Sequence, residues 1–163
     1  MPVFHFQFQS LLEQRNRERV LAQGEFARRR DQLRLAREEL NRKQQDHQCA
    51  VLRTQAALDL YKQSILDPER WPEALKASDH ASRLELEAAA LQKYVDAQHA
   101  VVVTLKLHAF EAAKALRECR RQELVLERLR ELSYDEFRQE EKDCLEAERE
   151  EFNISKYAAR RKS

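Results

Sequence analysis

The stretch SILDPERWPEALKASDHASRLE, residues 64–85, holds Pro68 and Pro72, two of the three prolines of this chain. Proline has no backbone N–H, and its ring clashes with the preceding turn, so a proline inside a helix breaks it. Each proline also pushes the residue before it out of the helical region. We therefore predict that one long helix ends near residue 66 and that another begins near residue 73.

Outside this stretch the chain carries almost nothing that would interrupt a helix. There is one glycine, Gly24, and neither glycine nor proline follows Glu73. The dominant residues, Ala, Leu, Glu, Gln, Arg and Lys, are the strongest helix formers, and charged residues make up 36% of the chain. The sequence predicts an all-α fold, a long antiparallel two-helix coiled-coil hairpin. Its single domain over 1–163 would contain helices at about 9–66 and 73–156, a turn at about 67–72 and a basic tail over 157–163.

Apolar residues recur every seven positions in both helices, which is typical of a coiled-coil seam. In the second helix one row contains Leu84, Leu91, Gln98, Leu105, Ala112, Cys119 and Leu126. The companion row contains Ala88, Val95, Val102, Ala109, Leu116, Glu123 and, two steps on, Phe137. In the first helix one row contains Leu12, Arg19, Phe26, Leu33, Leu40, His47, Thr54 and Tyr61. Its companion row contains Arg37, Gln44, Val51, Leu58 and Ile65.

The turn is too short for the two helices to pack in parallel, so they are expected to fold back antiparallel. If the turn is centred on Trp71, Leu40 lies near Val102 and Leu12 lies near Arg130. About 25 residues of the second helix would then extend past the first helix. Because such a hairpin buries little surface per residue, we expect a marginally stable monomer that works inside a complex.

Composition excludes several classes of function. The 30 basic and 29 acidic residues nearly cancel, so a nucleic-acid partner is not indicated. Three cysteines at unrelated spacings, Cys49, Cys119 and Cys144, argue against a disulfide framework and fit a reducing cytosol. The sequence has no secretory signal pattern and no apolar run of membrane-spanning length. It also has no glycine-rich phosphate loop and no zinc-type histidine spacing. We predict a protein that is not an enzyme, with no catalytic, cofactor-binding or metal-binding residues and no small-molecule substrate.

The first eight residues, MPVFHFQF, carry three of the seven phenylalanines at alternating positions. The antiparallel arrangement would put them at the open end of the hairpin, beside the C-terminal stretch EEFNISKYAARRKS. One interpretation is a hydrophobic plug that holds the helix ends together. The other is a docking tip, because exposed aromatic and arginine side chains often dominate the binding energy of an interface. The residues of the predicted tip are Phe4, Phe6, Phe8, Leu11, Leu12, Phe152, Ile154, Tyr157, Arg160 and Arg161.

Three segments resemble a known family. FHFQFQSLLEQRNRERVLAQGEF, residues 4–26, is similar to the N-terminus of the flagellar export protein family FliJ, which opens with aromatic alternation, two leucines and a charged helix. EREEFNISKYAARR, residues 148–161, resembles the family's acidic-then-basic end. LQKYVDAQ, residues 91–98, fits the family's spacing of leucine, an aliphatic residue and glutamine. The sequence departs from the family at Glu87, where members often carry an aromatic residue.

The resemblance implies a hairpin similar to the central stalk subunit of rotary ATPases, located at the cytoplasmic face of the inner membrane at the flagellar base. The end that bears both termini would dock in the pore of the hexameric export ATPase. The region around the turn would contact the cytoplasmic domain of the export gate, a membrane protein. Export chaperones would be further partners. The gate contacts implied in this sequence are Tyr61, Trp71, Leu91, Val95 and Gln98.

Three alternatives stay open at this point: a generic cytoplasmic coiled-coil scaffold, the equivalent stalk protein of a virulence-type secretion system, and a membrane-surface module whose phenylalanines insert into lipid. The membrane alternative needs a basic polar face beside the apolar one, and only His5 precedes Arg15 in that role. Long stable dimers keep their seam rows apolar, which disfavours a dimeric scaffold. Polar residues that interrupt the rows here are Arg19, Arg37, Gln44, Gln98 and Glu123.

Overall fold

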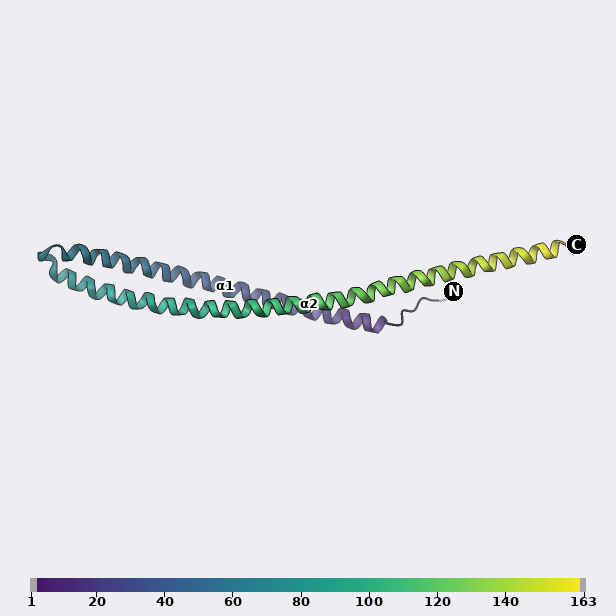
Figure 1. Cartoon of the computed structure of the whole chain (residues 1–163), viewed down its shortest axis with the longest axis horizontal. Helices are drawn as coiled ribbons and strands as arrows, with labels where there is room; N and C mark the ends of the chain where they lie inside the picture. The colour runs from purple at the N-terminus through teal and green to yellow at the C-terminus, as the bar shows by residue number, and fades with distance from the viewer. Residues whose placement is uncertain (1–2, 162–163) are drawn as a thin grey trace. The chain divides into compact units, whose positions relative to one another are not determined.

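The computed structural model describes residues 3–161, with side chains for residues 3–156. It contains helix α1 (Gln9–Ile65), a short 3₁₀ helix η1 (Pro68–Arg70) and helix α2 (Trp71–Arg161), and the described residues form no strand. The two long helices pack against each other in opposite directions (Figure 1). The predicted all-α helical hairpin is therefore confirmed.

The chain reverses direction at a single capped turn. Asp67 has an extended backbone (φ −116°, ψ 110°), as expected for the residue before a proline. Its carboxylate accepts a hydrogen bond from the backbone N–H of Glu69 at 3.2 Å, and its carbonyl accepts one from the N–H of Arg70 at 3.0 Å. These bonds satisfy backbone donors that would otherwise have no partner at the start of the new helix.

Both prolines lie in first turns rather than in the connection. Pro68 opens η1, and Pro72 is the second residue of α2. In a first turn the missing N–H costs no hydrogen bond, and the fixed φ of proline already suits a helix. Helix α2 therefore begins at Trp71, two residues before the predicted start, and it continues to Arg161 instead of ending at residue 156.

The chain divides into two compact units, each made of one part of α1 and one part of α2. The terminal unit consists of Met1–Gln23 and Lys114–Ser163, and the turn unit consists of Gly24–Ala113.

The predicted seam of α2 is confirmed in both units. Every residue of the two rows from Leu84 to Leu126 and from Ala88 to Glu123 is buried or half-buried, and so is Phe137. The second row continues toward the turn through Ala81 and Ala74, which are among the most buried residues of the chain. The seven-residue period therefore identified the face of α2 that packs against α1.

In α1 one predicted row is confirmed and the other is wrong. All residues of the row from Leu12 to Tyr61 are buried or half-buried, whereas Arg37, Gln44, Val51 and Ile65 are exposed. The true companion row lies one residue earlier and contains Arg15, Ala22, Arg29, Ala36, Lys43, Ala50, Ala57 and Ser64. Steps of three or four residues from the first row both fit a heptad, and the larger side chains of Val51, Leu58 and Ile65 favoured the wrong one.

Alanine dominates the buried seam. Buried alanines occur in α1 and in α2 at Ala36, Ala50, Ala57, Ala74, Ala81, Ala88 and Ala109, while none of the large side chains described over residues 3–156 is fully buried. Small side chains let two helices approach closely, but each alanine removes less apolar area from water than a leucine would. A few larger residues such as Leu33, Leu40 and Val95 must therefore supply much of the hydrophobic stabilisation of the turn unit.

One buried hydrogen bond fixes the register of the turn unit. The side-chain amide of Gln98 donates from Nε2 to the carbonyl oxygen of Ala36 at 3.1 Å, and both residues are buried. The predicted pairing of Leu40 with Val102 would put Ala36 about 12 Å from the level of Gln98, beyond the reach of a glutamine side chain. In the turn unit this bond therefore shifts the pairing, so that Leu40 faces residues of α2 that come before Val102. The reason is that the chain reverses over residues 66–70 rather than around Trp71.

This register predicts a pattern of distances from Cys49, which is exposed. With Cys119 and Cys144 replaced by serine, spin labels at Cys49 and at position 77, 85 or 93 should give the shortest distance for position 85. Position 93 should be more distant than position 85, because the bond places Cys49 nearer to the level of residue 85 along the axis. In the alternative register the distance would rise steadily from 93 to 77, and that result would contradict the Ala36–Gln98 alignment.

Candidate functional site

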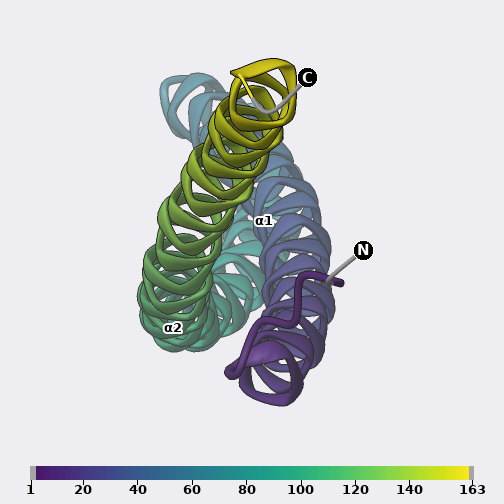
Figure 2. The same ribbon diagram turned by 90° about the vertical axis from the view of Figure 1, so that its right-hand side faces the viewer.

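Residues 3–8, which we call the aromatic segment, precede α1 in the terminal unit. Residues 3–6 are not helical, and a turn over residues 7 and 8 leads into the helix (Figure 2). Burial alternates along the segment: Phe6 is 5% exposed, Phe4 is half-buried, and Val3 on the other side is 88% exposed. Such alternation is expected of extended backbone, in which successive side chains point to opposite sides.

The buried side of the aromatic segment packs on α2. The ring of Phe4 lies 5.2 Å from that of Tyr134 in an edge-to-face arrangement and 5.6 Å from that of Phe137. The rings of Phe6 and Phe8 lie 5.8 Å apart, also edge to face. Aromatic pairs at these separations stabilise a contact by about 0.5–1.5 kcal/mol beyond the area they bury. This geometry favours the plug interpretation for Phe4 and Phe6.

The first turns of α1 extend this packed cluster. Leu12 is buried and Leu11 is half-buried. The backbone N–H of Gln9 donates to the carbonyl of Phe6 at 3.1 Å, and that of Leu12 donates to the carbonyl of Phe8 at 2.9 Å, so the segment is joined to the start of the helix. Of the predicted tip residues on this side, Phe8 retains the most exposed aromatic surface, at 37%.

Residues 142–156 of α2 have no helical partner among the described residues of the terminal unit. Every residue from 142 to 156 is exposed, including Leu145, Phe152 and Ile154, the last two at 66% and 68%. Phe152 lies about 22 Å beyond Phe137 along the helix, at ~1.5 Å per residue. The prediction that the phenylalanines and the C-terminal apolar residues meet at one tip is therefore wrong in its geometry. Tyr157, Arg160 and Arg161 lie outside the residues whose side chains are described.

This unpartnered helix is strongly acidic. The stretch from Arg138 to Glu151 contains seven acidic and three basic residues. Exposed apolar side chains therefore lie between carboxylates on this helix. This combination would complement a partner surface that is both apolar and basic. Isolated in water, the same stretch is held only by its helical backbone and by contacts along the helix such as the hydrogen bond from Gln139 to Asp143 at 2.8 Å.

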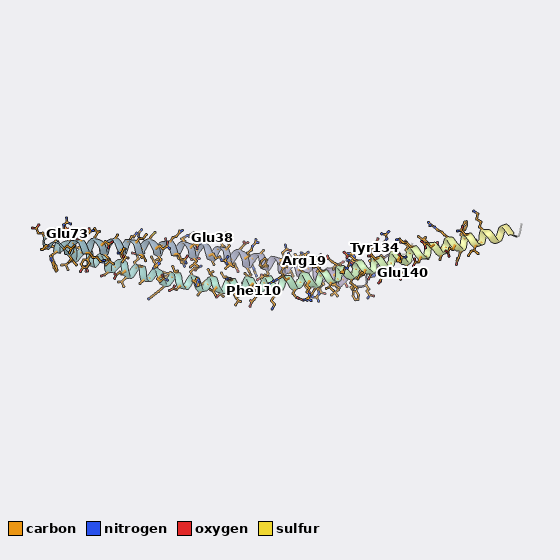
Figure 3. All side chains as sticks on the ribbon, turned by 45° about the horizontal axis from the view of Figure 1, so that its top comes forward. Arg19, Glu38, Glu73, Phe110, Tyr134 and Glu140 are labelled. Atoms are coloured by element: carbon orange, nitrogen blue, oxygen red, sulfur yellow. The ribbon has the colours of Figure 1, made fainter. Side chains whose placement is uncertain are left out.

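An ion pair crosses the seam of the terminal unit. Arg19 Nε lies 2.5 Å from a carboxylate oxygen of Glu123, and the two side chains are 27% and 10% exposed. Figure 3 labels Arg19 on α1. Both residues were predicted to interrupt the seam rows, and the structure shows that they neutralise each other. A buried carboxylate that loses its cationic partner is costly, so the pair specifies which part of α1 faces this part of α2.

Charge reversal tests this pair. The substitution Arg19→Glu should lower the free energy of unfolding by about 1–3 kcal/mol, because it places a second carboxylate beside Glu123. The swapped double variant Arg19→Glu, Glu123→Arg should recover a large part of that loss in urea unfolding. Equal stability of the single and double variants would mean that the two side chains do not interact.

The residues implied as gate contacts fall into two groups. Trp71 is 57% exposed beside the turn, and Tyr61 is half-buried, so both present surface to a partner. Val95 and Gln98 are buried in the seam and Leu91 is half-buried. In the closed hairpin these three residues hold α2 against α1, and Val95 and Gln98 offer almost no surface for a gate protein.

No protein-family model, curated protein or solved structure matches this chain. The resemblance to the FliJ family therefore rests on the three quoted segments alone. None of the helices in the described part of the chain has a stretch that is long and apolar enough to cross a bilayer.

The structure also shows two exposed apolar faces outside the predicted seam rows. In the turn unit, Val103, Leu107 and Phe110 form an exposed stripe on α2. In the terminal unit, exposed Leu124 and Val125 lie in a shallow hollow of about 490 Å³ whose other lining residues are Arg117, Arg120, Arg121 and Arg128. For the first face, the spacings of four and three residues outside the heptad rows were the available signal.

The remaining charges are those of solvated helix faces. A hydrogen bond from Arg29 is the main reason why the pKa of Glu25 is lowered, and one from Arg15 has the same effect on the pKa of Glu18. Both are contacts within one helix between residues three or four apart, so they stabilise α1 and indicate no chemistry. Of the three free cysteines, Cys119 is half-buried in the seam, whereas Cys49 and Cys144 are exposed.

Proposed function

We propose that this protein is a non-enzymatic stalk component of a bacterial flagellar type III export apparatus. It docks through its terminal unit in the pore of the hexameric export ATPase. The region of the turn links that ATPase to the cytoplasmic domain of the export gate, and export chaperones bind to the same protein. In this role the protein is monomeric on its own and peripheral to the cytoplasmic face of the inner membrane.

The observation that carries this proposal is the helix over residues 142–156, which is exposed on all sides. A single helix in water gains little stability beyond its intrinsic propensity, and apolar residues such as Phe152 and Ile154 gain nothing from being exposed. A ring that surrounds the helix would cover every face of it at once. A groove on a flat partner would cover only one face and would leave the others in water.

The hairpin of the turn unit supports the second half of the proposal. It holds exposed Trp71 at the chain reversal, separated in sequence by more than 70 residues from the docking segment. A large exposed aromatic residue is a frequent anchor of protein interfaces. The gate contact is therefore proposed to centre on Trp71 and Tyr61, with Leu91, Val95 and Gln98 acting through the stability of the hairpin.

Copurification tests the proposal directly. The tagged full-length chain should retain the type III export ATPase from the same cell, and a variant with Trp71→Ala should retain the ATPase but lose the export gate. Failure to retain the ATPase would contradict the stalk proposal. Retention of unrelated coiled-coil partners in its place would favour a generic scaffold.

A further inference from the structure

We propose that α2 carries a groove for extended aromatic peptide segments and that the chain's own aromatic segment is the resident occupant. The groove is the face of α2 bounded by Leu129, Ser133, Glu136, Phe137 and Glu140. A partner segment of the same chemistry, with phenylalanine at alternating positions and a basic residue between them, would bind there in trans. This inference does not depend on the identity of the export partners.

The aromatic segment bound in the groove shows which kind of peptide side chain the groove can accept. The extended backbone of residues 3–6 directs Phe4 and Phe6 to one side, and the ring of Phe4 contacts those of Tyr134 and Phe137 on α2. Tyr134 and Glu140 on this part of α2 are labelled in Figure 3. Recognition of alternate side chains of an extended segment is a known mode of peptide binding.

The aromatic segment is held by contacts that can be broken without unfolding either helix. Residues 3–6 make no helical hydrogen bonds, and the segment joins α1 through a turn at residues 7 and 8. A hollow of about 380 Å³ remains between the segment and α2, lined by residues of both. The hollow opens to solvent, so the face of α2 beside the segment is accessible. A second hollow of about 480 Å³ adjoins it, lined by Phe4, Glu127, Arg130, Glu131 and Tyr134.

The rim of the groove carries negative charge. Glu136 and Glu140 line the same hollow as His5, which lies between Phe4 and Phe6. A partner segment with arginine or lysine at the position of His5 would meet these carboxylates more favourably than a neutral residue does. The expected ligand is therefore an extended segment of the pattern Phe-basic-Phe.

The groove is occupied in the free protein because its occupant is tethered. A short tether gives the aromatic segment a high effective concentration, so a free peptide must compete with it. The apparent affinity for an added peptide falls in proportion to the fraction of molecules in which the groove is open. Loosening the resident segment should therefore reveal binding that the unmodified chain conceals.

The test uses the full-length chain and a fluorescent peptide with the sequence of residues 3–10, VFHFQFQS. In fluorescence anisotropy, the variant Phe4→Ala, Phe6→Ala should bind this peptide at least about tenfold more tightly than the unmodified chain does. Replacing histidine by arginine in the peptide should strengthen binding, and replacing it by glutamate should weaken it. Adding Phe137→Asp to the variant should abolish binding.

Two controls keep the proposal falsifiable. The variant Val3→Ala, at an 88% exposed position of the same segment, should bind the peptide as the unmodified chain does. If the double variant loses helicity by circular dichroism, the single variant Phe4→Ala takes its place and should show an intermediate gain. Equal peptide binding by the unmodified and loosened chains, or binding that is insensitive to Phe137→Asp, would overturn the proposal.

Discussion

Replacing Val95 by aspartate is expected to lower the free energy of unfolding of the turn unit by more than about 3 kcal/mol, and to remove most of its helical signal at 37 °C. Val95 is 8% exposed in the seam of α2, and the Ala36–Gln98 bond puts buried Leu40 at its level on α1. The substitution removes an apolar contact and buries a carboxylate. The nearest cation of the seam rows, Lys43, already pairs with Glu39 at 3.0 Å.

The large effect follows from the composition of the seam. Because most buried positions of the turn unit are alanines, few other side chains can compensate for the loss of a valine. The matched control is Leu86→Asp on the same helix, where the side chain is 73% exposed and the change should stay within about 0.5 kcal/mol. Similar urea midpoints for the two variants would show that Val95 does not lie in the core.

The second large effect concerns binding rather than folding. The double substitution Phe152→Asp, Ile154→Asp should weaken binding to the export ATPase by more than about 30-fold, because a few buried apolar anchors usually supply most of the energy of an interface. Its thermal melting should match that of the unmodified chain, since both side chains are already exposed. Isothermal titration with the purified ATPase and circular dichroism measure the two quantities separately.

The matched control for this experiment is Leu21→Asp. Leu21 is 74% exposed and also belongs to the terminal unit, but it lies on α1. The control should bind the ATPase normally. If the control and the double variant lose affinity equally, the binding surface is not the unpartnered helix, and the proposed docking of residues 142–156 is wrong.

Much of the fold could be predicted because its signals are local. Pro68 and Pro72 act on their own backbone and on the residue before each of them, so they located the turn regardless of what packs around it. The heptad rows of α2 could be recognised equally well in the sequence, because Leu, Val and Ala recur there on one face of the helix. In α1 the charged residues are so frequent that two neighbouring rows fitted the period, and the pattern of larger residues selected the wrong one.

The candidate site was predicted less well, because exposure depends on what lies opposite. The sequence grouped Phe6 with Phe152, since both are phenylalanines near a chain end. Packing separated them: α2 covers Phe6, whereas Phe152 lies beyond the reach of α1. In the same way Val95 and Gln98, implied as partner contacts by resemblance, became structural residues once the opposite helix was in place.

The sequence by itself determined that this chain is helical, that it reverses once and that one face of α2 is apolar, because helix propensity and proline sterics are properties of single residues and their neighbours. Only the tertiary structure decided which residues meet across the seam, such as Gln98 with the carbonyl of Ala36 in the turn unit and Arg19 with Glu123 in the terminal unit. These contacts join residues far apart in the chain, and their geometry depends on where the turn begins. A shift of a few residues at the turn changes every opposing pair, while the periodic pattern of each helix stays the same.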